Sequence, residues 1–386
     1  MGGRMRVYAA LCVIAAAIPT VDASAQSDWR IDTKPALDIS SSAAGGKVLF
    51  SRISGATRLS DGTIVIADAD DKVLHFLDAT GKPVRSAGRE GSGPGEFRNV
   101  TWFGRCSGDS LHVWDMLQRR MAVFAPNGAF ARQYLVPSDS ASGATPFMTL
   151  ACSSRGVIAF QSQPNMQKAR IAAKNPAMPT REERAIRTTA VVSVTNTSGK
   201  VTNRLGELPS STMYLMGGGG FPLPLAATTY LAVAGDRVFV GSADSTSSVS
   251  AYSPDGTMTV LKLNLAARQS TPAQRLRAAA AMASLAPKQM RAMAEDSLKV
   301  SPMPATLPPY SGLFGDTDGV LWVQLTVPGD PNTRLRAIGV DGRTLGEILL
   351  PPNVIVLEIG RDYVLAAYDD ADDLPHLAMY RLHRGR

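Results

Sequence analysis

"GATRLSDGTIVIADADDKVLHFLDATGKPVRSAG", residues 55–88, is the stretch of sequence that decides the fold. It divides into four short runs rich in β-branched and apolar residues, separated by the turn sequences SDG, DADD and ATGK. Each of these turns supplies the Asp or Gly residues that tight hairpins require. The four runs, residues 55–60, 63–69, 72–78 and 83–88, therefore predict one antiparallel four-stranded meander.

The turns of this meander recur along the chain, and a recurring unit indicates a repeat architecture. Including SDG, the first turn occurs six times, the later copies being SGDS before Leu111, SSRG before Val157, AGDR before Val238, DTDG before Val320 and GRD before Tyr363. The third turn occurs only five times, as ATGK, PNGA, TSGK, PDGT and VDGR. One strand is thus missing from the last unit, while residues 29–39 (WRIDTKPALDI) have no local partner.

These counts predict an all-β fold, a six-bladed β-propeller, as a single domain over residues 26–386. Residues 29–39 are expected to pair with residues 375–384 and so supply the outer strand of the last blade. Closing a ring in this way protects sheet edges that would otherwise promote aggregation.

The insertions in this ring are all predicted to lie on one face, which we call the decorated face. It carries the turns between second and third strands and the links between blades. The opposite face, which we call the first-turn face, carries only the short regular turns. The longest insertion, residues 267–309 between blades four and five, predicts two helices, the first capped by Thr271 and opened by Pro272, the second opened by Pro287. The other insertions are residues 138–146, 165–185 and 209–224.

The glycine-rich segment GREGSGPGEF, residues 88–97, invites comparison with a phosphate-binding loop. Its glycines alternate strictly, Pro94 removes an amide donor, and the residues that follow Phe97 favour a strand rather than a helix. A phosphate loop needs Gly-x-Gly-x-x-Gly followed by a helix. We therefore expect residues 88–97 to link blade one to blade two, with Phe97 wedged between the blades.

Residues 59–97 as a whole resemble an NHL-type propeller repeat, from the D-G-x-hydrophobic-V-x-D start to the closing G-x-G-x-G-x-F. The resemblance is close in blade one and limited to turn order elsewhere; blade two keeps VWD and VFAPNG but lacks the glycine string. The chain as a whole is similar to exported bacterial six-bladed propeller proteins of uncharacterised function. That resemblance implies the fold and no reaction.

The first residues predict a cleaved export signal, residues 1–25. Arg4 and Arg6 precede an apolar run, and Ala23-Ser24-Ala25 follows it with the small-x-small pattern of a cleavage site. No later run is long and apolar enough to predict a transmembrane segment. The mature protein is therefore expected to be periplasmic or secreted.

Export also predicts a disulfide. Cys106 and Cys152 precede equivalent turns in neighbouring blades, and an oxidising compartment allows them to form a disulfide.

The charge of the chain bears on its partners. The formal net charge of +7 is mostly dispersed, which does not favour nucleic-acid binding. We expect a monomer that binds a protein, peptide or glycan.

Acidic residues in the loops of adjacent blades are the first candidate binding residues. They should lie on the decorated face, and carboxylates in loops are the ligands that Ca²⁺ takes. No EF-hand or nonapeptide calcium spacing is present, and Asp is also the usual turn residue, so no cofactor is expected, with Ca²⁺ the one ion that could bind. The residues are Asp68, Asp70, Asp71, Asp115, Asp369 and Asp370, with Asp372 and Asp373 beside them.

A basic insert in blade three is the second candidate, and it suggests a partner of complementary charge. Its members are Lys168, Arg170, Lys174, Arg181 and Arg184. No catalytic residue is assigned, because His75, His112, His376 and His383 form no zinc motif and no G-x-S-x-G elbow exists. The sequence favours a non-catalytic binding propeller that uses its decorated face, the alternative being a metal-assisted hydrolase or lactonase with the acidic loops as ligands.

Overall fold

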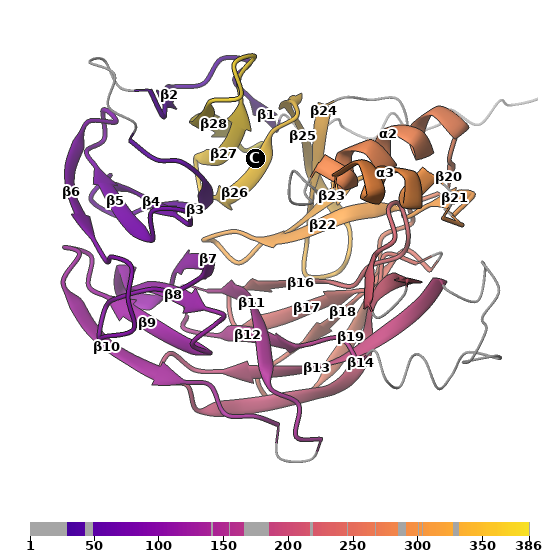
Figure 1. Cartoon of the computed structure of the whole chain (residues 1–386), viewed down its shortest axis with the longest axis horizontal. Coiled ribbons are helices and arrows are strands. Elements are labelled where there is room, and N and C mark those ends of the chain that lie inside the picture. Colours follow the sequence, from indigo (N-terminus) through magenta and orange to yellow (C-terminus); the bar gives the residue numbers. More distant parts are fainter. Residues whose placement is uncertain are drawn as a thin grey trace, which may run out of the picture.

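Six antiparallel sheets form a ring around a central axis, with the first strand of each sheet innermost (Figure 1). Each inner strand contacts the inner strand of the next blade. The structure is a computed structural model, and it describes residues 29–42, 49–139, 142–153, 155–165, 185–216, 219–244, 246–266, 268–284, 291–299, 301–302, 304–326 and 332–385. The predicted all-β six-bladed propeller is confirmed.

The blades follow one another in chain order. Blade one contains β3 (Ile53–Arg58), β4 (Ile64–Asp68), β5 (Val73–Leu77) and β6 (Pro83–Ala87). Blade two contains β7 (Val100–Arg105), β8 (Leu111–Asp115), β9 (Arg120–Phe124) and β10 (Phe130–Leu135). Blade three contains β11 (Pro146–Cys152), β12 (Ile158–Ser162), β13 (Ala185–Thr195), β14 (Val201–Met216) and β15 (Gly219–Pro222). Blade four contains β16 (Tyr230–Ala234), β17 (Arg237–Gly241), β18 (Ser248–Tyr252) and β19 (Met258–Lys262). Blade five contains β22 (Tyr310–Gly315), β23 (Leu321–Leu325), β24 (Asn332–Ile338) and β25 (Thr344–Pro352).

Blade six is completed from the N-terminal end of the described chain, as predicted. Its own strands are β26 (Ile355–Ile359), β27 (Tyr363–Asp369) and β28 (Pro375–His383). Two short strands, β1 (Arg30–Ile31) and β2 (Leu37–Ser40), both pair antiparallel with β28. The register places Ile31 opposite Leu382 and Leu37 opposite Met379. The closure is thus made by two pieces of strand separated by a bend.

The glycine-rich segment between blades one and two has the linking role that its sequence predicts. Phe97 is fully buried in a core cluster shared by the two blades, with its ring 5.8 Å from that of Phe124. Gly88 has a φ of 82°, and a Cβ there would lie 2.5 Å from the Phe97 ring, so this position needs glycine.

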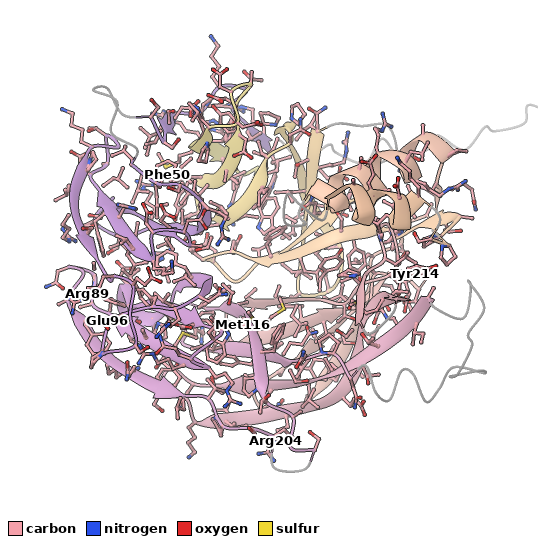
Figure 2. All side chains as sticks on the ribbon, viewed as in Figure 1. Phe50, Arg89, Glu96, Met116, Arg204 and Tyr214 are labelled. Carbon is pink, nitrogen blue, oxygen red and sulfur yellow. A yellow bond between two sulfur atoms is a disulfide. The ribbon has the colours of Figure 1, made fainter. Side chains whose placement is uncertain are left out.

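The polar groups of the same segment are satisfied within the protein. The buried guanidinium of Arg120 donates to the carbonyl oxygens of Ser92, Gly93 and Glu96. Glu96 accepts the Gly93 amide and pairs with Arg89, and Figure 2 shows Arg89 and Glu96 together near the rim of the ring. The amides of Gly91, Glu96 and Phe97 also donate to carbonyl oxygens of the same segment, so these amides form no free cradle for a phosphate.

The insertion between blades four and five contains two helices bracketed by a small sheet. The helices are α2 (Pro272–Ser284) and α3 (Arg291–Lys299), and the sheet pairs β20 (Arg268–Gln269) with β21 (Thr306–Leu307). Thr271 and Gln274 form a reciprocal capping box, because each backbone amide donates to the other side chain. In the described part of the chain, no helix combines the length and hydrophobicity needed to cross a membrane.

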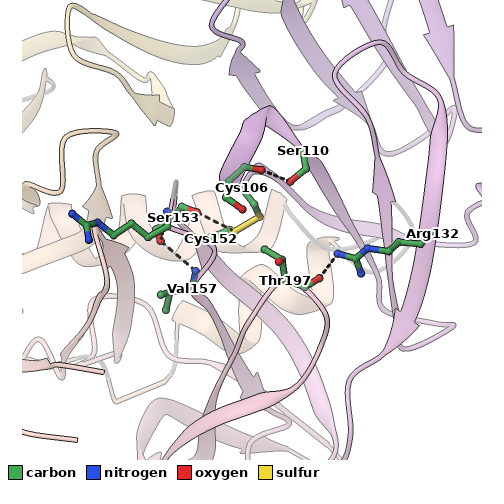
Figure 3. The surroundings of a disulfide bond; sticks show 9 residues. Cys106, Ser110, Arg132, Cys152, Ser153, Val157 and Thr197 are labelled. Carbon is green, nitrogen blue, oxygen red and sulfur yellow. Dashed lines mark hydrogen bonds between the residues drawn. A yellow bond between two sulfur atoms is a disulfide. The ribbon is translucent and has the colours of Figure 1, made fainter. Parts of the chain in front are cut away.

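A disulfide joins Cys106 and Cys152, with Cα atoms 5.6 Å apart (Figure 3). It links the C-terminal end of β11 to the residue that follows β7, so it joins blades two and three next to the axis. Two further contacts cross the same boundary: Arg132 donates to the carbonyl of Thr197, and Trp114 Nε1 donates to the carbonyl of Phe147 at 2.9 Å. The predicted disulfide is present in the structure.

Candidate functional site

The described part of the ring encloses a cavity of about 680 Å³ around the axis, which we call the axial cavity. Its wall includes residues of the inner strands β3, β7, β11, β16, β22 and β26, one strand from each blade, mostly toward their C-terminal ends. Its rim includes Ser60, Asp61, Asp109 and Thr317, which belong to turns between first and second strands. The axial cavity therefore opens toward the first-turn face.

The cavity has room because three successive blades present small residues to it. Gly104, Ala151 and Ala232 all line the wall, from β7, β11 and β16. Gly104 also makes room for an aromatic neighbour, since a Cβ at this position would lie 2.5 Å from the ring of Trp102. Trp102 and Phe314 add aromatic surface to the same wall.

A polar network from three blades crosses one side of the axial cavity. Arg105 of blade two donates to Asp109 Oδ1 and to Glu358 Oε1 of blade six, both at 3.1 Å. Ser60 of blade one donates its amide and its hydroxyl to Asp109 Oδ2, at 2.9 and 2.5 Å. The second oxygen of Glu358 accepts the amide of Arg58 at 2.8 Å. One guanidinium is therefore held between two carboxylates in the cavity wall.

Burial and hydrogen bonding shift the pKa values of the two carboxyl groups that contact Arg105. Burial raises the pKa of Glu358, and the nearby Arg105 guanidinium only partly offsets this effect. Burial would also raise the pKa of Asp109, but hydrogen bonds from Ser60 and Arg105 outweigh it and lower that pKa. Thr57 is 1% exposed and lines the cavity. Its hydroxyl is shielded from solvent and adjoins the Glu358 carboxyl, whose pKa it helps to lower.

The decorated face carries a smaller, mainly apolar cavity of about 340 Å³. Its wall includes Thr212 of β14, Asp244 after β17 and Pro308 beyond the helices. Arg187 lies beside it and donates to the hydroxyls of Thr212 and Thr229. This is where the insertions predicted to decorate one face come together in the described residues.

The carboxylates of Asp68 and Asp70, predicted as ligands in blade one, are occupied by neighbouring segments of the chain. Asp68 is fully buried and accepts the amides of Ser51, Arg52, Asp70 and Asp71. Asp70 also pairs with the Arg52 side chain at 2.7 Å. Carboxylates that accept several backbone amides organise turns.

Asp115 has the corresponding position in blade two and the same role. It is fully buried and accepts the amides of Arg98 and Gln118 together with the side-chain amide of Gln118. The axial cavity has neither Asp68 nor Asp115 in its described wall.

Of the predicted acidic residues in blade six, Asp370 belongs to a network around His376. His376 Nδ1 lies 2.9 Å from Asp38 of β2, and Nε2 lies 3.2 Å from Asp370. The Tyr368 hydroxyl donates to Asp38 at 2.7 Å, and its ring stacks on the imidazole. Asp369 ends β27 opposite Pro375. This network attaches the N-terminal strand to the last blade.

His112 lies in β8, the second strand of blade two, as a strand residue. His112 is fully buried, and burial lowers its pKa to about 4, so it is a neutral strand residue at pH 7. The basic insert (Lys168, Arg170, Lys174, Arg181 and Arg184) and the predicted signal, residues 1–25, lie outside the described residues. Within the described part of the chain, no three His, Cys, Asp or Glu side chains come close enough to hold a metal ion.

Arg105, Asp109 and Glu358 were not identified from the sequence. A local signal does exist, because Glu358 interrupts the apolar inner strand IVLEI and Arg105 ends the inner strand VTWFGR. Charged side chains are rarely placed in such strands without a partner. Their pairing could not be read from the sequence, since the two residues are 253 positions apart.

Comparison with known proteins supports the fold. No family profile matches the chain, and no curated protein matches it. A member of the DUF4221 family from Bacteroides vulgatus has a TM-score of 0.51 and 9% identity, covering 93% of this chain and 100% of that chain. At this identity the similarity shows a shared fold only.

Two further structures are more distant. A protein from Bacteroides fragilis described as exported has a TM-score of 0.46 and 12% identity, covering 95% of this chain and 98% of that chain. A virginiamycin B lyase from Staphylococcus aureus, in a catalytically inactive form, has a TM-score of 0.39 and 10% identity, covering 85% of this chain and 80% of that chain. The likeness of blade one to NHL-type repeats stays a prediction.

Proposed function

We propose that the protein is an exported, non-catalytic binding propeller that takes a segment of a protein, peptide or glycan into its axial cavity. The observation that carries this proposal is a cavity of about 680 Å³ whose wall comes from all six blades. Ligand sites commonly measure about 300–1,000 Å³ and combine apolar walls with a few placed polar groups. The axial cavity has both, in its small and aromatic residues and in its polar network.

The chemistry of the wall favours binding over catalysis. Its described residues include the hydroxyls of Ser60 and Ser153 but no histidine or lysine, and its cysteines are joined to each other. A serine nucleophile needs a base that accepts its proton. The carboxylate bonded to Ser60 is Asp109, whose lowered pKa makes it a weak base.

Metal-assisted hydrolysis is the competing proposal, and it needs several carboxylate oxygens directed at one point. The carboxylates of the wall are already engaged. Asp61 accepts the amide of Thr63, Asp316 accepts Trp322 Nε1 and pairs with Arg384, and Asp109 and Glu358 share Arg105. A metal would have to displace these partners in order to coordinate several oxygens at once, whereas a hydrogen-bond donor of a ligand needs only one remaining lone pair.

The proposal is tested by blocking the mouth of the axial cavity. Thr317→Trp places an indole on the rim, whereas Val340→Trp adds the same ring to an exposed position in another turn of blade five. Saturation-transfer NMR with short peptides and with trisaccharides as probes measures binding to each variant. We expect Thr317→Trp to abolish the transfer and Val340→Trp to preserve it.

The opposite result would overturn the proposal. If a folded Thr317→Trp variant binds every probe as the wild type does, the ligand site lies elsewhere. Blocking the cavity of about 340 Å³ by Ala227→Trp would then test the decorated face. Both variants are compared with the wild type in thermal unfolding, so that loss of folding is not mistaken for loss of binding.

A further inference from the structure

The axial cavity carries an excess of negative charge. Its described wall contains four carboxylates, Asp61, Asp109, Asp316 and Glu358, and one cationic side chain, Arg105. Asp316 is neutralised from behind the wall by Arg384, at 2.8 Å. The wall therefore carries three further carboxylates and one guanidinium, which forms ion pairs with Asp109 and Glu358. A ligand entering the cavity meets a negative potential.

A nearby cation outside the wall does not cancel this excess. The Arg58 side chain lies over the ring of Tyr363, with its guanidinium carbon 5.0 Å from the centroid, and its nearest carboxylate is Asp362 at 3.6 Å. Arg58 contributes its backbone amide to Glu358. The charge of its side chain is thus directed to blade six and not into the cavity.

The wall also offers aromatic surface beside its carboxylates. An ammonium group has three donors and no acceptor, so it suits a site whose charged groups are mainly carboxylates. Trp102, Phe103 and Phe314 line the same cavity, and aromatic faces attract cations at short range.

The contacts of Arg105 show that the carboxylates of this wall can hold a cationic group. The Arg105 guanidinium already lies between Asp109 and Glu358 at 3.1 Å from each. From these contacts we infer that the axial cavity selects a peptide through a positively charged group, the ammonium of its N-terminus or of a lysine side chain. This inference rests on the proposed function, because it assigns the ligand class of the same cavity.

Four forms of one tetrapeptide amide, Ala-Ala-Lys-Ala-NH₂, test the inference. They are the free peptide, the form acetylated at the N-terminus, the form acetylated at the lysine, and the doubly acetylated form. Titration calorimetry gives the dissociation constants. We expect the doubly acetylated peptide to bind about tenfold more weakly than the free peptide, because one charge-assisted contact is lost. The two singly acetylated forms show which ammonium is recognised.

A matched pair of variants ties the effect to the cavity wall. Asp61 and Asp255 are both exposed turn residues whose Oδ1 accepts, at 2.9 Å, the amide of a threonine two positions later. Only Asp61 lines the axial cavity. We expect Asp61→Asn to weaken binding of the free peptide about threefold and Asp255→Asn to leave it unchanged. Glu358→Gln is expected to have a larger effect, but it also removes a partner of Arg105.

The outcomes separate the inference from the function on which it rests. Equal affinity for free and doubly acetylated peptides, with both abolished by Thr317→Trp, overturns the cationic preference and leaves the binding function standing. Binding of the free peptide that survives Thr317→Trp overturns the function itself. If none of the four peptides binds at millimolar concentration, the peptide assignment is wrong.

Discussion

The ring is held together at two boundaries by different means. Blades two and three are joined covalently through Cys106 and Cys152, which are 46 residues apart. Blade six is joined to the first described residues of the chain by strand pairing and by two His–Asp contacts, His383–Asp32 and His376–Asp38, each at 2.9 Å. These closure residues are 351 and 338 positions apart.

The difference shows how a ring of this length can be closed without a covalent bond. The entropic cost of closing a loop rises only slowly with its length, so the distant closure costs little more than the short one. It must nevertheless be made entirely by contacts in the folded state. These include the buried Ile39, the half-buried Leu37 and Ile31, and Trp29, whose ring lies 5.4 Å from that of Trp322. The disulfide instead restricts the unfolded chain.

Removing the closure strands is expected to have the largest effect on stability. A chain that begins after residue 40 lacks β1 and β2, and β28 becomes an exposed sheet edge. The burial of Ile39 alone is worth roughly 1.5–3 kcal/mol, and three further apolar side chains add to it. We expect the cooperative thermal transition to be largely lost. A truncation that stops before Trp29 is the control, and identical melting profiles for the two would show that the closure does not stabilise the ring.

Breaking the disulfide is expected to cost less. A loop of this size corresponds to about 4 kcal/mol in the chain-entropy treatment, and measured values are usually about 2–4 kcal/mol. The double variant Cys106→Ala/Cys152→Ala should therefore unfold at lower denaturant concentration than the oxidised wild type. Its unfolding should also be insensitive to reductant, unlike that of the wild type. Two titratable thiols in the unreduced, unfolded mature protein would contradict the assignment.

These two boundaries were predictable from the sequence to different extents. The closure follows from counting turns, because Asp and Gly in tight turns are local signals that do not depend on the rest of the chain. The disulfide follows from equivalent positions in neighbouring blades. The sequence predicts residues 29–39 as one strand, whereas a bend divides the closure into β1 and β2.

The candidate site was less predictable, because it depends on contacts between distant residues. In the sequence, Asp68 and Asp115 look like metal ligands in loops. An aspartate that only accepts the amides of its own loop has the same local sequence, and both residues have that role. Arg105 and Glu358 meet across the wall of the axial cavity only when the ring is closed. The first-turn face has short turns and carries this cavity, so the length of its loops gave no indication of it.

The closure of blade six is also expected to depend weakly on pH, through His376. Burial favours the neutral imidazole of His376, but hydrogen bonds and charges of Asp38 and Asp370 outweigh it and raise its pKa above 6.5. Those two carboxylates and the Tyr368 hydroxyl are the groups bonded to the ring. The stability that protonated His376 contributes through these two carboxylates is therefore fully present below pH 6.5, and it is lost as pH rises through the folded-state pKa of His376.

We expect His376→Gln to lower the free energy of unfolding by about 0.2–1 kcal/mol at pH 6, the range for partly exposed ion pairs, and by less at pH 9. Denaturant unfolding at several pH values measures the difference. His75→Gln is the control, because burial lowers the pKa of His75 and its contribution changes only in acid. The disulfide variant should show the same loss at both pH values. A constant difference between wild type and His376→Gln from pH 6 to 9 would mean that the closure is held by strand pairing and apolar contacts alone.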